Sequence, residues 1–112
     1  MYVRIARFEG GSSARFDAER DRLLKDLEAI RRGESDTEIP AEIARKISRV
    51  EMMVDRERGA SAMSIYCETA AQMREVHEAL DAMSPGDGEG RRVSVEIYEL
   101  ALDEATQVSQ AA

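Results

Sequence analysis

Hydrophobic and polar residues alternate along four short segments of the chain, and this alternation is typical of strands. The first segment spans residues 2–9 and is interrupted by Gly10-Gly11. The second and third, at 50–54 and 61–67, flank a turn-like sequence that ends in Gly59, so together they predict a hairpin. The fourth begins at Val93, and Leu100 and Leu102 are expected to extend it. The pattern therefore predicts four strands.

Two longer segments carry hydrophobic residues at helical spacing. In the first, Phe16, Leu23, Leu27 and Ile30 form one stripe, which predicts a helix over 14–32 with Ser12 or Ser13 as the N-cap and Gly33 at its end. The second segment opens with Thr69 and Gln72, which fit a capping box, and continues with Met73, Val76, Leu80 and Met83 on one face. A shorter helix is predicted at about 39–48, where Ile39, Ile43 and Ile47 recur every four residues.

The order of these elements is β-α-(α)-β-β-α-β, which predicts an α+β chain with the ferredoxin-like βαββαβ fold. Such a fold has a four-stranded antiparallel sheet with the two main helices on one face. With 112 residues and 43% hydrophobic residues, the chain has the size and core of one domain. We assign residues 1–102 to that domain, treat 34–48 as an insertion within it, and expect 103–112 to be a flexible tail.

Because helices cover one face of the sheet, the other face is expected to be open. We expect the helix-facing set to be Val3, Ile5, Met63, Ile65, Val93, Val95 and Ile97. The open face would then present Tyr2, Arg4, Phe8, Ser64, Tyr66, Glu96, Tyr98 and Leu100, with either Met53 or Met52. Such a mixture of aromatic and polar residues is typical of an interface or a ligand cavity. It predicts a homodimer whose paired sheets enclose a cavity.

Charge and cysteine content narrow the function classes. Residues 1–58 hold 13 basic and 13 acidic side chains, and residues 59–112 hold 3 and 10, which gives a net charge of −7. The sequence has no basic stripe for phosphates, so nucleic acid is not an expected partner. It also has no apolar run of membrane-spanning length and no signal-peptide h-region at its N-terminus, so no membrane partner is expected. The single cysteine, Cys67, fits a reducing compartment, and the expected location is the cytoplasm.

Several segments resemble small actinobacterial-type proteins of the dimeric α+β barrel superfamily, in the antibiotic biosynthesis monooxygenase-like group. The similar segments are the first ten residues, the stretch 50–59 with its Asp55-Arg56-x-x-Gly59 turn, residues 64–69, and residues 95–100. The resemblance implies a dimer with a cavity between sheet and helices. It also implies a possible cofactor-independent monooxygenase reaction on a small aromatic or quinone-like compound. The alternative is a small-molecule-binding or stress-associated dimer of the same fold without catalysis.

Candidate site residues follow from this resemblance and from the expected open face. The cavity candidates for binding an aromatic ligand are Phe8, Tyr66, Tyr98 and Met53. For catalysis, Glu96 or His77 would take a proton from a phenolic substrate, and Arg4 would stabilise the resulting anion. The alternatives are a cross-strand Arg4–Glu96 ion pair, and a half-buried His77 at the border of its helix.

No metal and no cofactor are expected from the sequence. A lone cysteine and a lone histidine provide no metal-ligand spacing. Haem-degrading members of the similar group use an asparagine and a tryptophan, and this chain has neither. The glycine-rich segment 84–90 follows a helix instead of preceding one, so it does not fit a phosphate-binding loop.

Overall fold

The computed structural model describes residues 1–34, 39–83 and 90–108, and its centre is a four-stranded antiparallel sheet. The strands are β1 (Tyr2–Glu9), β2 (Arg49–Asp55), β3 (Ala60–Cys67) and β4 (Arg91–Glu99). They lie in the order β2-β3-β1-β4, and β1 pairs with both β3 and β4. The chain is thus an α+β protein whose strand order is compatible with a ferredoxin-like fold.

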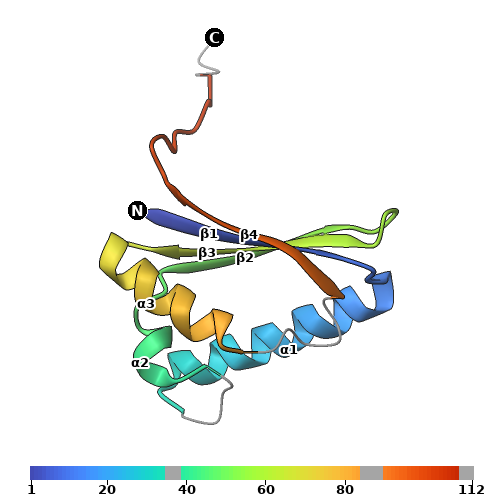
Figure 1. Cartoon of the computed structure of the whole chain (residues 1–112), viewed down its shortest axis with the longest axis horizontal. Helices are drawn as coiled ribbons and strands as arrows, with labels where there is room; N and C mark the ends of the chain where they lie inside the picture. The colour runs from blue at the N-terminus through green and yellow to red at the C-terminus, as the bar shows by residue number, and fades with distance from the viewer. Residues whose placement is uncertain (35–38, 84–89, 109–112) are drawn as a thin grey trace.

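Two main helices lie on one face of the sheet, and a short third helix lies beside them (Figure 1). Helix α1 (Ser13–Arg31) begins at Ser12, whose hydroxyl accepts from the backbone N–H of Arg15, and it ends before Gly33 at φ +74°. Helix α3 (Ala70–Asp81) begins with the predicted capping box, because Thr69 and Gln72 bond reciprocally. Helix α2 (Ala41–Ala44) is a single turn, shorter than the predicted 39–48, and Lys46 just after it forms an ion pair with Glu75 of α3.

Helix α1 is fixed to the rest of the molecule at its N-terminal end. Phe16 is only 1% exposed, and its ring lies so close to Gly11 that a Cβ on Gly11 would overlap it. Arg56 in the β2–β3 turn forms an ion pair with Asp17 at 2.7 Å, and Gly11 N–H donates to the carbonyl of Gly59 at 2.9 Å. Toward its C-terminal end α1 diverges from the sheet, as Figure 1 shows. The helix therefore lies at an angle to the sheet, close to it at the N-terminal end and further from it at the C-terminal end.

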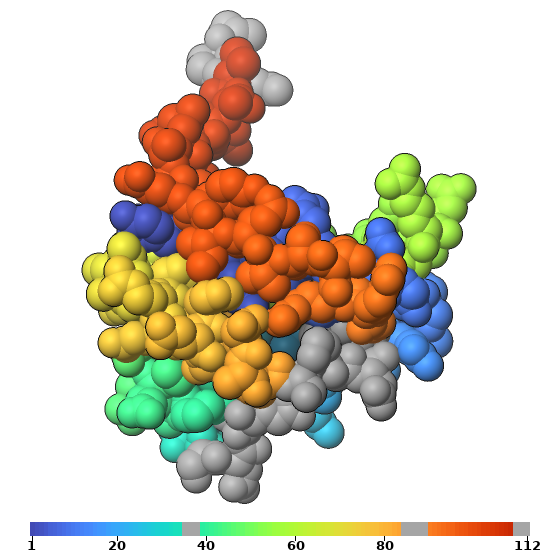
Figure 2. Space-filling model, viewed as in Figure 1, coloured from blue at the N-terminus to red at the C-terminus, as the bar shows by residue number. Residues whose placement is uncertain are grey.

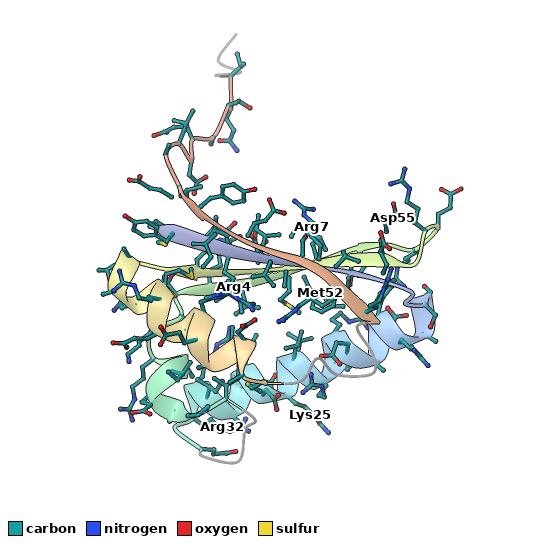
Figure 3. All side chains as sticks on the ribbon, in the orientation of Figure 1. Arg4, Arg7, Lys25, Arg32, Met52 and Asp55 are labelled. Atoms are coloured by element: carbon teal, nitrogen blue, oxygen red, sulfur yellow. The ribbon has the colours of Figure 1, made fainter. Side chains whose placement is uncertain are left out.

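The structure corrects the predicted faces of β1. Arg4 is paired in register with Ile65 and Ile97, so these three residues share the helix-facing side, and Ala6 and Phe8 lie on it too. Val3 and Ile5 lie on the open face instead. Figure 3 shows Arg4 and Met52 on the helix side of the sheet and Arg7 on the other side. The alternation in β1 was predicted correctly, but its direction was wrong at each of the five β1 residues to which a face had been assigned.

The faces of the other strands agree with the prediction at most positions. Met63, Ile65, Val95 and Ile97 share the helix-facing register, and Met52 joins them while Met53 takes the open face. The open face consists of Arg49, Glu51, Met53, Ala62, Ser64, Tyr66, Val3, Ile5, Arg7, Ser94, Glu96 and Tyr98. Val93 falls at the register shift opposite Arg7 and Phe8 and is exposed.

The ends of the chain differ from the prediction in one further respect. Strand β4 ends at Glu99, so Leu100 and Leu102 do not extend it. Residues 100–108 have no regular secondary structure, and residues 109–112 of the predicted tail lie outside the described part. The glycine-rich segment, apart from Gly90, and most of the predicted 34–38 linker are also outside it. Among the described residues, no helix has the length and apolar character needed to cross a bilayer.

Gly59 offers a stability test of the contact between the β2–β3 turn and α1. Gly59 and Gly33 both have positive φ, but a Cβ on Gly59 would lie 2.5 Å from the Gly11 carbonyl oxygen, whereas one on Gly33 would meet nothing within 4 Å. We expect Gly33→Ala to lower the free energy of unfolding by about 1–2 kcal/mol, the cost of the left-handed backbone. Gly59→Ala should cost distinctly more, because the Gly11 backbone must also move. Urea denaturation of the two variants measures the difference, and equal costs would show that the contact is relaxed easily.

Candidate functional site

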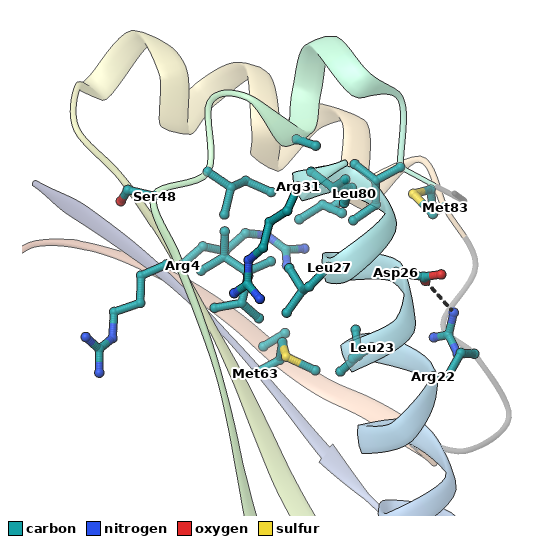
Figure 4. Close-up of a pocket in the computed structure, with 18 of the residues that line it drawn as sticks. Arg4, Arg22, Leu23, Asp26, Leu27, Arg31, Ser48, Met63, Leu80 and Met83 are labelled. Carbon is teal, nitrogen blue, oxygen red and sulfur yellow. Dashed lines mark ion pairs between the residues drawn. The ribbon is translucent and has the colours of Figure 1, made fainter. Parts of the chain in front are cut away.

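Between α1 and the sheet lies a partly open cavity of about 440 Å³. This volume lies within the ordinary range for small-molecule sites, roughly 300–1,000 Å³. Figure 4 shows the cavity between the sheet and α1, with Leu80 and Met83 at one side and Ser48 at another. Its lining residues are Arg4, Ala6, Phe8, Arg22, Leu23, Asp26, Leu27, Ile30, Arg31, Ile39, Ala44, Ile47, Ser48, Arg49, Val50, Met63, Ile65, Leu80, Met83 and Arg92.

The apolar part of the wall comes from residues that the sequence placed in helical and strand stripes. Leu23, Leu27 and Ile30 of α1 point toward the sheet but stay only half-buried, because the helix stands away from the strands there. Met63 and Ile65 of β3 form the facing floor. These apolar residues would form a closed core if α1 packed directly on the sheet, but here they line a cavity.

Arginines dominate the polar part of the wall. Five arginines and one carboxylate, Asp26, contribute to it, although the whole chain has a net charge of −7. One of the five, Arg49, borders the cavity from the start of β2, where its register position is on the open face. Three of the five have carboxylate partners: Arg22 pairs with Glu19 and Asp26, Arg49 with Glu51, and Arg92 with Asp81. Arg4 and Arg31 have no carboxylate partner among the residues that the structure describes.

Arg4 is the most deeply placed of these arginines. It is 4% exposed, and its Nε donates a hydrogen bond to Nδ1 of His77 on α3 at 3.1 Å. Since Nδ1 accepts, the ring proton of the neutral imidazole lies on Nε2. Burial lowers the pKa of the Arg4 guanidinium from its usual value, and the nearby Arg92 charge lowers it further, while Asp81 raises it. Arginine stays protonated at neutral pH, so the buried group is a cation.

The structure divides the predicted site residues between two faces. Arg4 and Phe8 line the cavity under the helices, and His77 contacts Arg4 without being part of the lining. Glu96 and the other binding candidates lie on the open face, namely Tyr66, Tyr98 and Met53. The predicted Arg4–Glu96 ion pair is wrong, because Glu96 is opposite Ile5 in the register and pairs with Arg7 at 3.2 Å.

The open face carries two hydrogen-bonded tyrosine–glutamate pairs. Tyr66 donates to Glu51 at 2.7 Å, and Tyr98 donates to Glu96. These bonds lower the pKa of each glutamate, most strongly through the tyrosine hydroxyl, and raise the pKa of each tyrosine. A carboxylate held in its charged form in this way is a poor proton acceptor near neutral pH. The arrangement therefore speaks against Glu96 as a general base.

Cys67 is fully buried at the end of β3. Burial raises the pKa of the Cys67 thiol, which keeps it in its unreactive protonated form. Within the described residues, no group of three or more histidine, cysteine, aspartate or glutamate side chains is placed to hold a metal ion.

Sequence reasoning missed the cavity arginines Arg31 and Arg92. Both belong to charged pairs of residues, Arg31-Arg32 and Arg91-Arg92, which resemble any solvated surface segment. They line one cavity with Arg4 because of which face of β1 meets the helices and because of the angle between α1 and the sheet. Neither feature can be recognised from the spacing of residues in the sequence. Comparison of the chain with protein-family models, with curated proteins and with solved structures finds no match.

Proposed function

We propose that this protein binds a small, largely apolar organic compound in the cavity between α1 and the sheet. The observation that carries the proposal is the cavity itself, about 440 Å³ in volume, lined mainly by apolar side chains together with five arginines, one aspartate and one serine. Sites for small molecules are typically of this size and composition. An aromatic compound fits the proposal, because its flat ring suits a gap between a helix and a sheet.

The proposal includes a homodimer formed through the open faces. Met53 and Tyr98 are nearly half exposed on that face. Ile5 lies near its centre beside Val3, which the single chain already buries. In Figure 2 the β2–β3 turn and the segment 103–108 project from the body, on the side away from the helices. Such projections would flank a second copy seated on the sheet. The cytoplasm is the proposed location, supported by the free, buried thiol of Cys67.

A cofactor-independent, monooxygenase-like reaction on a small aromatic or quinone-like compound is the second candidate. The placement of Arg4 favours it, since a guanidinium in an apolar cavity would stabilise a phenolate. The resemblance to the antibiotic biosynthesis monooxygenase-like group of the dimeric α+β barrel superfamily also supports it. Oxygen uptake after a phenolic ligand is added to the aerated protein distinguishes catalysis from binding alone.

A pair of leucine variants on α1 tests the binding site. Leu27 lines the cavity, whereas Leu24, one turn earlier on the same helix, is 50% exposed to solvent. We expect Leu27→Trp to fill the cavity and weaken the binding of 2-naphthalenemethanol at least tenfold, measured by calorimetric titration. Leu24→Trp adds the same side chain outside the cavity and should leave the affinity unchanged. If both variants bind the compound equally well, or if the wild-type protein binds neither this alcohol nor the matching carboxylate, 2-naphthoate, the cavity is not the site.

A further inference from the structure

Arg4 is a buried cation whose binding capacity is largely unused. A guanidinium has five N–H donors, and the Arg4 Nε–H is used by His77. The terminal nitrogens form no ion pair with any residue that the structure describes. Because no fully buried side-chain nitrogen of the described residues lacks a hydrogen-bond partner, these terminal nitrogens must reach solvent-accessible space. A cation without a counter-ion beside apolar walls favours a ligand that supplies a negative charge.

The charges around Arg4 further favour an anionic ligand. Arg92 lies close enough to lower the Arg4 pKa, and Asp81, which acts in the opposite direction, is already ion-paired with Arg92 at 3.1 Å. In Figure 4, Arg31 extends from α1 toward the sheet and faces the same cavity. Two guanidinium groups without carboxylate partners in the described part of the chain thus contribute to one cavity, one from each wall.

The rest of the cavity does not suit a highly charged ligand. Leu23, Leu27 and Ile30 cover one wall, and Met63 and Ile65 cover the other. An apolar body with one anionic group would satisfy both parts of the lining. Guanidinium groups bind carboxylate and phosphate oxygens through paired hydrogen bonds, which gives the anion a defined position.

We infer that the ligand of this cavity is an organic anion, whose carboxylate or phosphate group binds Arg4 and whose apolar body lies against α1. The inference rests on the proposed function, since it names the chemical class of the compound that the cavity binds. Arg31 approaches the same group from the helix. The whole chain has a net negative charge, so the preference for an anion would come from the cavity and not from the overall surface charge.

The test compares ligands of one shape and different charge on the full-length protein. We expect 2-naphthoate to bind at least tenfold more tightly than the neutral 2-naphthalenemethanol, because a charge-assisted hydrogen bond replaces a neutral one. The comparison of 2-naphthoate with 2-naphthyl phosphate shows which anionic group the site prefers. This comparison uses the wild-type protein, so it holds even if a variant fails to fold.

Two arginine variants on β1 then test whether the preference for the anion depends on Arg4. Arg4→Met should reduce the affinity for 2-naphthoate to that for 2-naphthalenemethanol, without weakening the alcohol. Arg7→Met is the matched control, because Arg7 lies on the same strand but on the open face, paired with Glu96. It should retain the preference for the anion.

The outcomes separate this inference from the proposed function. Equal binding of the acid and the alcohol to the wild-type protein would overturn the inference and leave the proposed function standing. The same holds for an anion preference that survives in Arg4→Met. Binding of none of the compounds would overturn both.

Discussion

Replacing Phe16 with alanine should lower the free energy of unfolding by about 3–5 kcal/mol, the usual cost of removing a fully buried phenylalanine. Phe16 is 1% exposed and lies against Gly11, next to the β2–β3 turn. Because α1 diverges from the sheet beyond this point, no other residue of the helix is as deeply buried in an apolar contact. Thermal unfolding followed by circular dichroism should show a fall in Tm of roughly 10–20 °C.

The control for Phe16 is on the same helix. Leu24→Ala removes apolar side-chain atoms from a residue that is 50% exposed, so we expect a change of no more than about 0.5 kcal/mol. A small effect of Phe16→Ala, close to that of Leu24→Ala, would contradict the view that α1 is fixed at its N-terminal end.

Replacing Tyr98 with aspartate should weaken the proposed dimer at least about 100-fold, since burying an unpaired charge costs a few kcal/mol. Tyr98 is 47% exposed on the open face, where a partner would cover it. The new carboxylate would also lie next to Glu96 on the same face. Sedimentation velocity at several protein concentrations measures the dimerisation constant.

Leu24→Asp is the matched control for the dimer, because Leu24 is equally exposed but lies on α1, away from the open face. It should leave the sedimentation behaviour unchanged. A dimer that tolerates Tyr98→Asp but dissociates with Leu24→Asp would move the interface to the helices, and a wild-type monomer at micromolar concentration would overturn the dimer itself.

Local signals explain why the secondary structure could be predicted from the sequence. The reciprocal bonds of Thr69 and Gln72 begin α3, and Gly33 adopts the left-handed conformation that ends α1. These features depend on residues within one turn of each other, so the chain specifies them without tertiary contacts. The hairpin around Gly59 is local in the same sense. The short α2 is the exception, because the isoleucine spacing of 39–47 serves the cavity wall as much as a helix.

The candidate site could not be derived in the same way, because it depends on which face of β1 meets the helices. Val3 and Ile5 are the more apolar set, so hydrophobicity favours them for the core. The structure instead places Arg4, Ala6 and Phe8 there, since Phe8 joins the core cluster and Arg4 finds His77. Because side chains alternate along a strand, shifting the inward-facing positions by one residue moves every side chain to the opposite face of the sheet. The candidate site residues on β1 therefore all lie on the face opposite to the predicted one, while those on β3 and β4 lie on the predicted open face.

The angle between α1 and the sheet determines how selective the proposed ligand site would be. At 1.5 Å per residue the helix is about 28 Å long, so a rotation of about 5° around its fixed end would move the far end by roughly 2.5 Å. Ligands of different thickness can therefore be accommodated by a small tilt of one wall. Arg4 does not share this freedom, because β1 is held between two paired strands. The protein should accordingly discriminate strongly by where a ligand carries its charge and only weakly by how thick its hydrocarbon body is.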